Sequence, residues 1–143
     1  MESLPMSHLF AALALAVTFG GMTFFSAIMA PLVFTKLPPH IAGDFIRQIF
    51  PWYYLAMGVP ILIALAAVFL AAGSSVTWRV VTATLVLAGF AFARQVLMPM
   101  INRARDGQMA GVAGAARRFK RLHFASVVIN GFQWLAVLAV LIV

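Results

Sequence analysis

The chain contains no cysteine and very little acidic charge. Of its 143 residues, three are Asp or Glu, and charged residues of both signs together make up only 9%. The absence of cysteine excludes disulfides, thiolate metal sites and thiol nucleophiles. The sequence also shows no paired carboxylates, no Ser/His/Asp grouping and no phosphate-binding loop. We therefore expect neither enzymatic activity nor a cofactor.

Apolar residues dominate what is present. Hydrophobic residues make up 64% of the chain and the mean hydropathy is +1.05, whereas ordinary soluble domains are about 25% charged. Four apolar stretches are each about long enough to cross a bilayer, which takes roughly 20 residues. They cover residues 9–34, 52–72, 76–101 and 124–143. The sequence predicts an all-α integral membrane bundle of four transmembrane helices, forming a single domain over residues 1–143.

Proline, glycine and serine mark the predicted boundaries between these spans. Pro38 and Pro39 are expected to end the first helix, because proline lacks the backbone N–H and disfavours helix in the residue before it. Pro51 is predicted to open the second helix after a short amphipathic piece, 41–50. The turn at 73–75 is so short that the second and third helices must be antiparallel neighbours. The remaining polar region, 102–121, is predicted to be a basic cytoplasmic loop.

The distribution of Lys and Arg predicts the orientation. Six basic residues lie between the third and fourth spans, and Lys36 and Arg47 lie between the first and second. Because positive loops stay on the cytoplasmic side, both termini should face away from the cytoplasm. The net charge of +7 is explained by anionic lipid headgroups rather than nucleic acid, for which no recognition module is present. High Ala and Arg with little Lys is typical of GC-rich bacteria, so we expect the inner membrane.

Arg94 is the most informative polar residue, because it lies inside the third apolar stretch. A charge at the centre of a membrane helix costs about 2.5–3.5 kcal/mol on insertion scales. Arg94 can therefore either pair inside the bundle or extend toward the lipid phosphates. In the fourth span, His123, Ser126, Asn130 and Gln133 fall on one helical face at about 3.6 residues per turn.

Together, Arg94, His123, Ser126 and Asn130 form a predicted polar intramembrane cluster in the cytoplasmic half. Asn130 is the expected partner of Arg94, because the two should lie at similar depth in antiparallel helices. Two interpretations stay open, since such a cluster either binds a solute or supplies interhelical hydrogen bonds that hold the bundle together.

Two further groups of residues carry predictions. Trp52, Tyr53 and Tyr54 are predicted to anchor the chain at the membrane interface as an aromatic belt. A weaker possibility is a cuprous-ion site formed by Met98, Met100 and His123, because thioethers select Cu(I). A haem between His8 and His123 is disfavoured, since the topology puts them on opposite sides of the bilayer.

Short motifs in a common order run along nearly the whole chain. They comprise Ser7-His8-Leu9, Gly20-Gly21, Phe34-x-x-Leu37-Pro38, Phe45, Phe50-Pro51-x-Tyr53, Ala93-Arg94, Pro99 and Phe119-x-x-x-His123-x-x-Ser126-x-x-x-Asn130. In the order and spacing of these motifs, the chain resembles the small membrane proteins similar to transmembrane protein 205, which are grouped as domain of unknown function 4149. The resemblance implies a four-helix membrane protein and little about activity. The chain departs from that pattern at two positions. It has Met98 where an acidic residue can precede the proline, and the glutamine expected upstream of the Phe-Pro pair is displaced, as Gln48.

Three functional classes follow from these observations. The first is a non-enzymatic accessory or assembly component of a larger membrane complex, or of a homo-oligomer. The second is a protein that binds or transports a small solute or copper-like metal through the polar cluster. The third, a cofactor-bearing redox protein, needs ligands that the predicted topology does not align.

Overall fold

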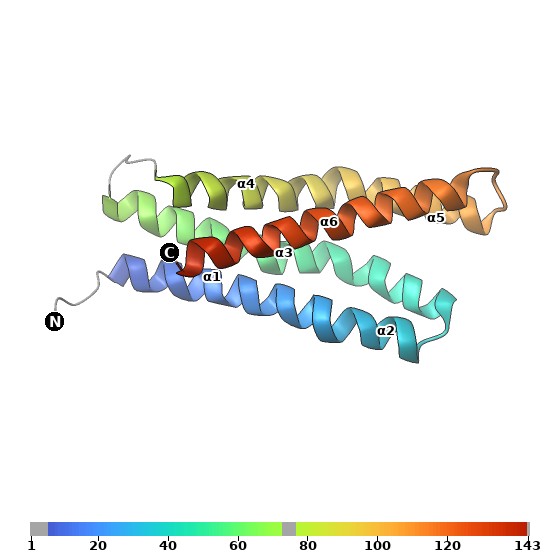
Figure 1. The fold of residues 1–143 in the computed structure, drawn as a ribbon, viewed down its shortest axis with the longest axis horizontal. Coiled ribbons are helices and arrows are strands. Elements are labelled where there is room, and N and C mark those ends of the chain that lie inside the picture. Colours follow the sequence, from blue (N-terminus) through green and yellow to red (C-terminus); the bar gives the residue numbers. More distant parts are fainter. Residues whose placement is uncertain (1–5, 73–76, 143) are drawn as a thin grey trace.

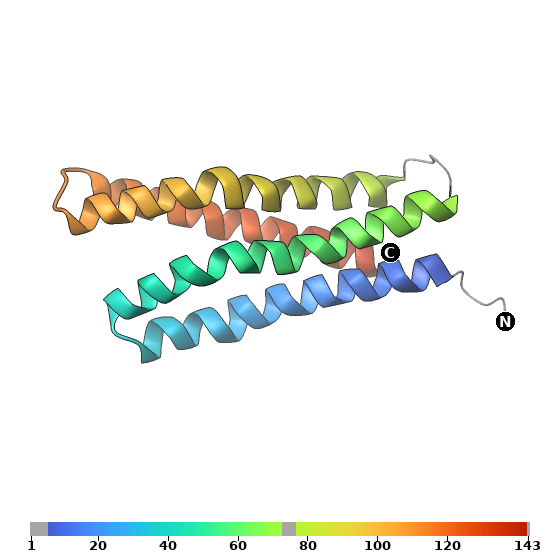
Figure 2. The same ribbon diagram turned by 180° about the vertical axis from the view of Figure 1, so that it is seen from behind.

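The computed structural model describes residues 6–72 and 77–142, which form long helices running side by side (Figure 1). The helices are α1 (Met6–Phe24), α2 (Ala30–Lys36), α3 (Pro39–Ala72), α4 (Trp78–Phe92), α5 (Met98–Met109) and α6 (Ala115–Ile142). A π-helical turn, η1 (Phe25–Met29), joins α1 to α2, and a second, η2 (Ala93–Leu97), joins α4 to α5. The predicted turn at 73–75 lies outside the described residues. The view from behind shows the same bundle of antiparallel helices (Figure 2).

Four of these helical segments are long and apolar enough to cross a membrane. They are Leu9–Lys36, Pro39–Phe69, Trp78–Met109 and Ala115–Ile142. Each exceeds the roughly 20 residues that span the hydrocarbon core. The predicted four-helix, multi-pass architecture is therefore confirmed.

Two predicted boundaries differ from the structure. Pro51 does not open the second span, because α3 begins at Pro39 and continues through both Pro51 and Pro60. Membrane helices tolerate internal proline where neighbouring groups satisfy the freed backbone. The region 102–121 is also mostly helical, since α5 extends to Met109 and α6 begins at Ala115. The connection is reduced to residues 110–114, where Gly111 (φ 72°) and Gly114 (φ 79°) adopt the left-handed conformation that favours glycine.

Both π-turns precede a proline by the same interval. The first ends at Met29 before Pro31, and the second ends at Leu97 before Pro99. A proline in a helix cannot donate to the carbonyl four residues earlier, and its ring clashes with that carbonyl. A wider turn relieves this clash, which explains why the first and third spans depart from regular α-helix at these positions.

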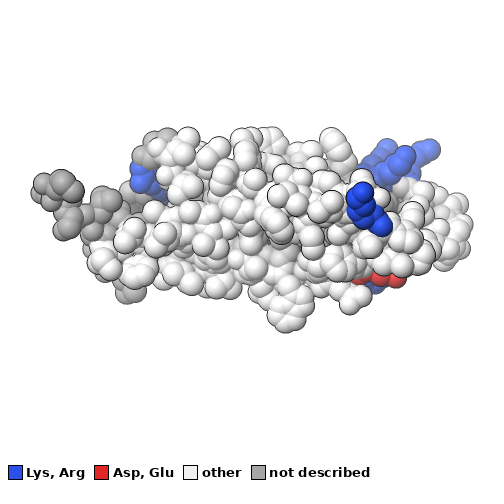
Figure 3. Space-filling model, turned by 90° about the horizontal axis from the view of Figure 1, so that it is seen from below, with Lys and Arg blue, Asp and Glu red and all other residues white. Residues whose placement is uncertain are grey.

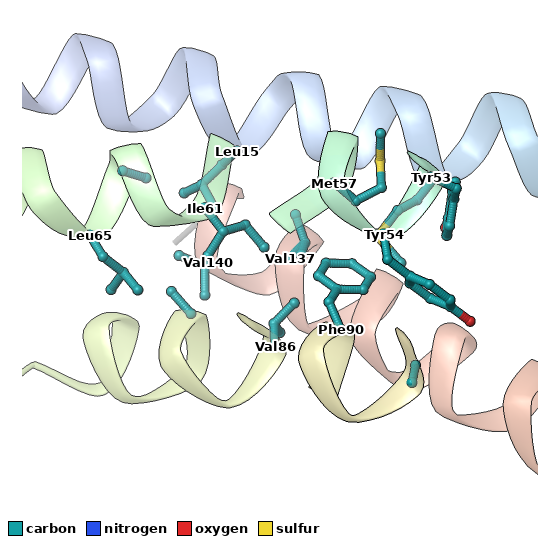
Figure 4. Packing of buried hydrophobic residues seen from close by; sticks show 14 of the residues in the cluster. Leu15, Tyr53, Tyr54, Met57, Ile61, Leu65, Val86, Phe90, Val137 and Val140 are labelled. Atoms are coloured by element: carbon teal, nitrogen blue, oxygen red, sulfur yellow. The ribbon is translucent and has the colours of Figure 1, made fainter. Parts of the chain in front are cut away.

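The packed core lies in the half of the bundle that contains the N-terminal part of α1 and the C-terminal part of α6. Ile61, Phe90 and Val137 are almost completely buried there, and Figure 4 shows them meeting between α3, α4 and α6. Gly21 permits the close approach of α1 and α3, because a Cβ at this position would lie 2.8 Å from the Met57 sulfur. The absence of a side chain at Gly21 therefore allows α1 and α3 to pack closely.

Candidate functional site

A pocket of about 860 Å³ occupies the other half of the bundle. It lies between α2 and the N-terminal half of α3 on one side and α5 and the N-terminal half of α6 on the other. Its walls are mainly apolar, with contributions from Phe25, Phe34, Ile46, Phe50, Met98 and Phe119. Its polar groups include His40, Asn102, Arg105, Gln108, His123 and Ser126. The pocket is thus an apolar cavity with a small number of hydrogen-bonding groups.

Two reciprocal ion pairs connect α3 and α5 near the end of the bundle that contains the turn 110–114. Arg47 on α3 contacts Asp106 on α5 at 2.7 Å, and Arg105 on α5 contacts Asp44 on α3 at 3.2 Å. Arg47 and Arg105 also line the pocket. These ion pairs therefore join the hairpin of the first two spans (α1, η1, α2 and α3) to the hairpin of the last two (α4, η2, α5 and α6), with the pocket between them.

At its inner end, the pocket is bounded by a chain of hydrogen bonds between three helices. The Tyr53 hydroxyl donates to Asn130 Oδ1 at 3.0 Å, and Asn130 Nδ2 donates to Ser26 Oγ at 3.3 Å. All three residues line the pocket. Asn130 therefore connects α6 to α3 and to η1, which is the interhelical role that the sequence allowed for it.

The structure divides the predicted polar cluster. Three members, His123, Ser126 and Asn130, line the pocket together on α6. Arg94 is not among the lining residues, and its Nε donates to the Pro51 carbonyl oxygen at 3.4 Å. Asn130 is engaged by Tyr53 and Ser26 instead of Arg94. The expected Arg94–Asn130 contact is thus replaced by two separate sets of contacts.

The comparison with protein families agrees with this architecture. The family described as domain of unknown function (DUF4149) matches residues 13–110, which is more than half of the chain. The chain belongs to the DUF4149 family. No match was found among curated proteins or among solved structures. The resemblance to transmembrane protein 205 itself stays a prediction.

The residues matched to DUF4149 contribute only part of the pocket. They include the walls formed by η1, α2, α3 and α5, whereas the α6 wall with His123, Ser126 and Asn130 follows the matched segment. Because both parts enclose one cavity, the complete site requires α6 as well as the DUF4149 segment.

The aromatic residues after Pro51 occupy different environments in this DUF4149 protein. Trp52 is 72% exposed and faces outward, consistent with contact to the surrounding membrane. Tyr53 and Tyr54 are buried and line the inner end of the pocket, at the edge of the packed cluster in Figure 4. This differs from the predicted belt, because consecutive residues of a helix point in different directions, about 100° apart.

The weak metal candidates are only partly brought together. Met98 and His123 both line the pocket, but Met100 is not among its lining residues. Within the part of the chain that the structure describes, no group of three or more His, Cys, Asp or Glu residues could hold a metal ion. The His8 side chain lies outside the described part.

Sequence reasoning missed Asp44, Asp106 and Gly43 at this site. The guanidinium group of Arg105 rests against Gly43 and fills the space that a side chain there would occupy. The sequence does contain an indication of this contact. Asp44 precedes Arg47 by three residues on one helix, whereas Arg105 precedes Asp106 on another, so that the acidic and basic residues follow in opposite order. Reading the two pairs together would have predicted contact between α3 and α5.

Proposed function

We propose that this chain is a non-enzymatic protein of the bacterial inner membrane that binds a small molecule in its intramembrane pocket. The observation that carries the proposal is the pocket itself. Small-molecule sites are typically concave, mostly apolar cavities of about 300–1,000 Å³ with a few placed polar groups. The volume of about 860 Å³ and the mainly apolar walls fit that description.

The polar groups at the inner end of the pocket bind one another. Tyr53 donates to the Asn130 carbonyl oxygen, and Asn130 in turn donates one amide hydrogen to Ser26. These contacts hold α3, α6 and η1 together, so the inner end of the cavity would keep a fixed shape for an apolar part of the ligand.

Charge supports placing the pocket in the cytoplasmic half of the bilayer. Eight Lys and Arg residues belong to the ends of α2, α3, α5 and α6 that meet at this end of the bundle, whereas Arg79 starts α4 at the opposite end. Figure 3 shows the basic side chains concentrated toward one end of the molecule. Since positive segments are retained in the cytoplasm, the pocket would open toward the inner leaflet, and both termini would face the other side.

A pocket-filling substitution tests the proposal. Ala30 lines the pocket from α2, whereas Ala16 is an exposed residue of α1. Protein extracted gently from its own membrane should retain a small-molecule adduct in native mass spectra. We expect Ala30→Phe to lose the adduct, because the added ring occupies the cavity, and Ala16→Phe to keep it.

The alternatives give different spectra. A bare chain in the wild type, or equal retention by Ala30→Phe and Ala16→Phe, would contradict the proposal. Retained partner chains without a small molecule would instead favour the accessory role that the sequence suggested. A metal adduct would favour Met98 and His123 as ligands.

A further inference from the structure

The pocket is long enough to reach from the membrane surface to the centre of a bilayer. Along α3 it is lined from Pro39 to Tyr54, and fifteen residues of helix at 1.5 Å each correspond to about 22 Å. Half of the hydrocarbon core measures about 15 Å. The pocket therefore covers the depth that one leaflet lipid occupies, from headgroup to chain end.

The walls also leave access from the side. Among the described residues, α6 packs against α1, α4 and α5, but α2 and α6 are not a closely packed pair. At its inner end the pocket adjoins a smaller hollow of about 290 Å³, with which it shares Ser26, Val127 and Asn130. The hollow is bordered by Ala27 and Gly131, which are exposed residues of η1 and α6. The side of the pocket between α2 and α6 is thus not closed by packed helices, and this is the side on which a lipid could enter.

The two ends of the pocket differ in charge. Its inner part is bounded by Phe25, Phe50 and Tyr54, whereas Arg105 lines its outer part. In the described chain, the outer end of the bundle carries eight Lys and Arg residues against two Asp, so the surrounding charge is strongly positive. An anionic group is therefore favoured at the outer end, and an apolar group at the inner end.

Arg105 is held in a position to contact such an anion. Its side chain is only 18% exposed, and its guanidinium group rests on Gly43. Both hydrogen bonds that the structure gives it, to the His40 carbonyl and to Asp44, use Nη2. The Nε and Nη1 hydrogens have no partner among these two bonds and can each donate a charge-assisted hydrogen bond to a carboxylate or phosphate oxygen.

Resting on the proposed function above, we propose that the ligand is a single-chain amphipathic anion taken from the cytoplasmic leaflet. Its carboxylate or phosphate lies against Arg105, and its hydrocarbon chain follows the aromatic wall toward Tyr53 and Tyr54. The length of the pocket, the side access and the charge difference between its ends all favour this class over a water-soluble solute.

Three probes with the same acyl chain test the inference on purified, delipidated full-length protein. Palmitate and palmitoyl lysophosphatidate carry the two anionic headgroups, and monopalmitoylglycerol is their uncharged counterpart. We expect the wild type to bind at least one anion about tenfold or more tightly than the glycerol ester, as a charge-assisted hydrogen bond would give. Which of the two anions binds more tightly tells whether the natural ligand carries a carboxylate or a phosphate.

Arg105→Gln should remove this preference, so that the ratio of anion affinity to monopalmitoylglycerol affinity falls to about one. The matched control is Arg103→Gln, which deletes the same charge from an exposed position on the same helix. Gly43→Ala is a second variant, because it keeps the charge but displaces the guanidinium group from its place on α3. It should also weaken anion binding if Arg105 must be positioned.

The outcomes separate this inference from the proposed function. Equal affinity of the wild type for all three probes, or equal losses in Arg103→Gln and Arg105→Gln, would overturn the amphipathic anion but leave a binding pocket in place. Failure of every probe to bind, together with a bare chain in native mass spectra, would overturn both.

Discussion

Arg47 on α3 and Asp106 on α5 form a two-point ion pair, with Nη1–Oδ1 at 2.7 Å and Nη2–Oδ2 at 3.1 Å. The two residues are 59 positions apart in the sequence and belong to different helical hairpins. Their contact lies beside a second pair, Arg105–Asp44, in which the order of charges is reversed. Both carboxylates of the described chain are thus used to hold the two sides of one pocket together.

A double-mutant cycle should detect this coupling. Arg47→Gln and Asp106→Asn should each lower the free energy of unfolding, with a coupling of about 0.2–1 kcal/mol, because both side chains are about half exposed. The coupling should shrink as salt is raised, since exposed charges are screened. Unfolding in mixed detergent micelles measures it.

The matched control pairs Arg79→Gln with Asp106→Asn. Arg79→Gln removes the same charge from an exposed position at the opposite end of the bundle, so this second cycle should show no coupling. If the Arg47 cycle also gave zero coupling at low salt, the ion pair would contribute nothing to joining the hairpins.

Gly89 is predicted to be intolerant of a side chain. A Cβ there would lie 2.7 Å from Gln133 Nε2, and that amide is buried and donates to the Val86 carbonyl oxygen at 3.1 Å. Gly89→Ala should therefore cost about 1–2 kcal/mol, since Gln133 must move and lose this hydrogen bond. The loss is measured as a lower free energy of unfolding in detergent.

Gly131 provides the control on the facing helix. A Cβ at Gly131 would meet no atom within 4 Å, so Gly131→Ala should be neutral or stabilise α6 by about 0.5–1 kcal/mol. Equal stability of the Gly89→Ala and Gly131→Ala variants would mean that Gln133 moves aside without cost.

The number and position of the helices could be predicted from the sequence because length and apolarity alone decide which segments cross a bilayer. The helix ends could not be predicted as well. Pro51 is a boundary signal in water, but α3 continues through it, because neighbouring helices and local backbone adjustments compensate for the missing N–H in a membrane protein. The same reasoning explains why the polar stretch 102–121 is mostly helix.

Side-chain directions within each span were harder to predict. A helix surrounded by lipid and protein is apolar on all sides, so periodicity gives little indication of which face points inward. Trp52 and Tyr53 are neighbours of similar character, yet Trp52 is exposed and Tyr53 is buried. Arg94 shows why individual contacts are also hard to predict. Its depth in the membrane was compatible with Asn130 as a partner, but the rotation of the third span about its axis brings Arg94 to the Pro51 carbonyl oxygen instead.

The hydroxyl of Tyr53 is expected to stabilise the inner end of the pocket. Tyr53→Phe leaves Asn130 Oδ1 without the donor that lies at 3.0 Å, and interhelical hydrogen bonds of this kind contribute about 0.6–2 kcal/mol. We expect the free energy of unfolding to fall by that amount. Freed from this contact, Asn130 can turn its polar amide into the inner end of the pocket, where the apolar chain of the ligand would lie, so ligand affinity should fall as well.

Tyr54→Phe is the comparison for this measurement. Tyr54 is equally buried beside Tyr53, and no hydrogen bond involves its hydroxyl among the described residues. Its replacement should therefore change stability and affinity less than Tyr53→Phe does. The opposite ranking would contradict the role assigned to the Tyr53–Asn130 contact.

The absence of native cysteine makes the orientation directly testable. Val112 lies exposed in the 110–114 turn, and Met6 lies exposed at the start of α1. Single substitutions Val112→Cys and Met6→Cys introduce one thiol each at opposite ends of the bundle. With a membrane-impermeant maleimide, Val112→Cys should be labelled in inverted vesicles and Met6→Cys in spheroplasts, because the positive segments are held in the cytoplasm. Labelling in the reverse pattern would move the pocket and its basic end to the outer leaflet, where a cytoplasmic-leaflet lipid could not supply the ligand.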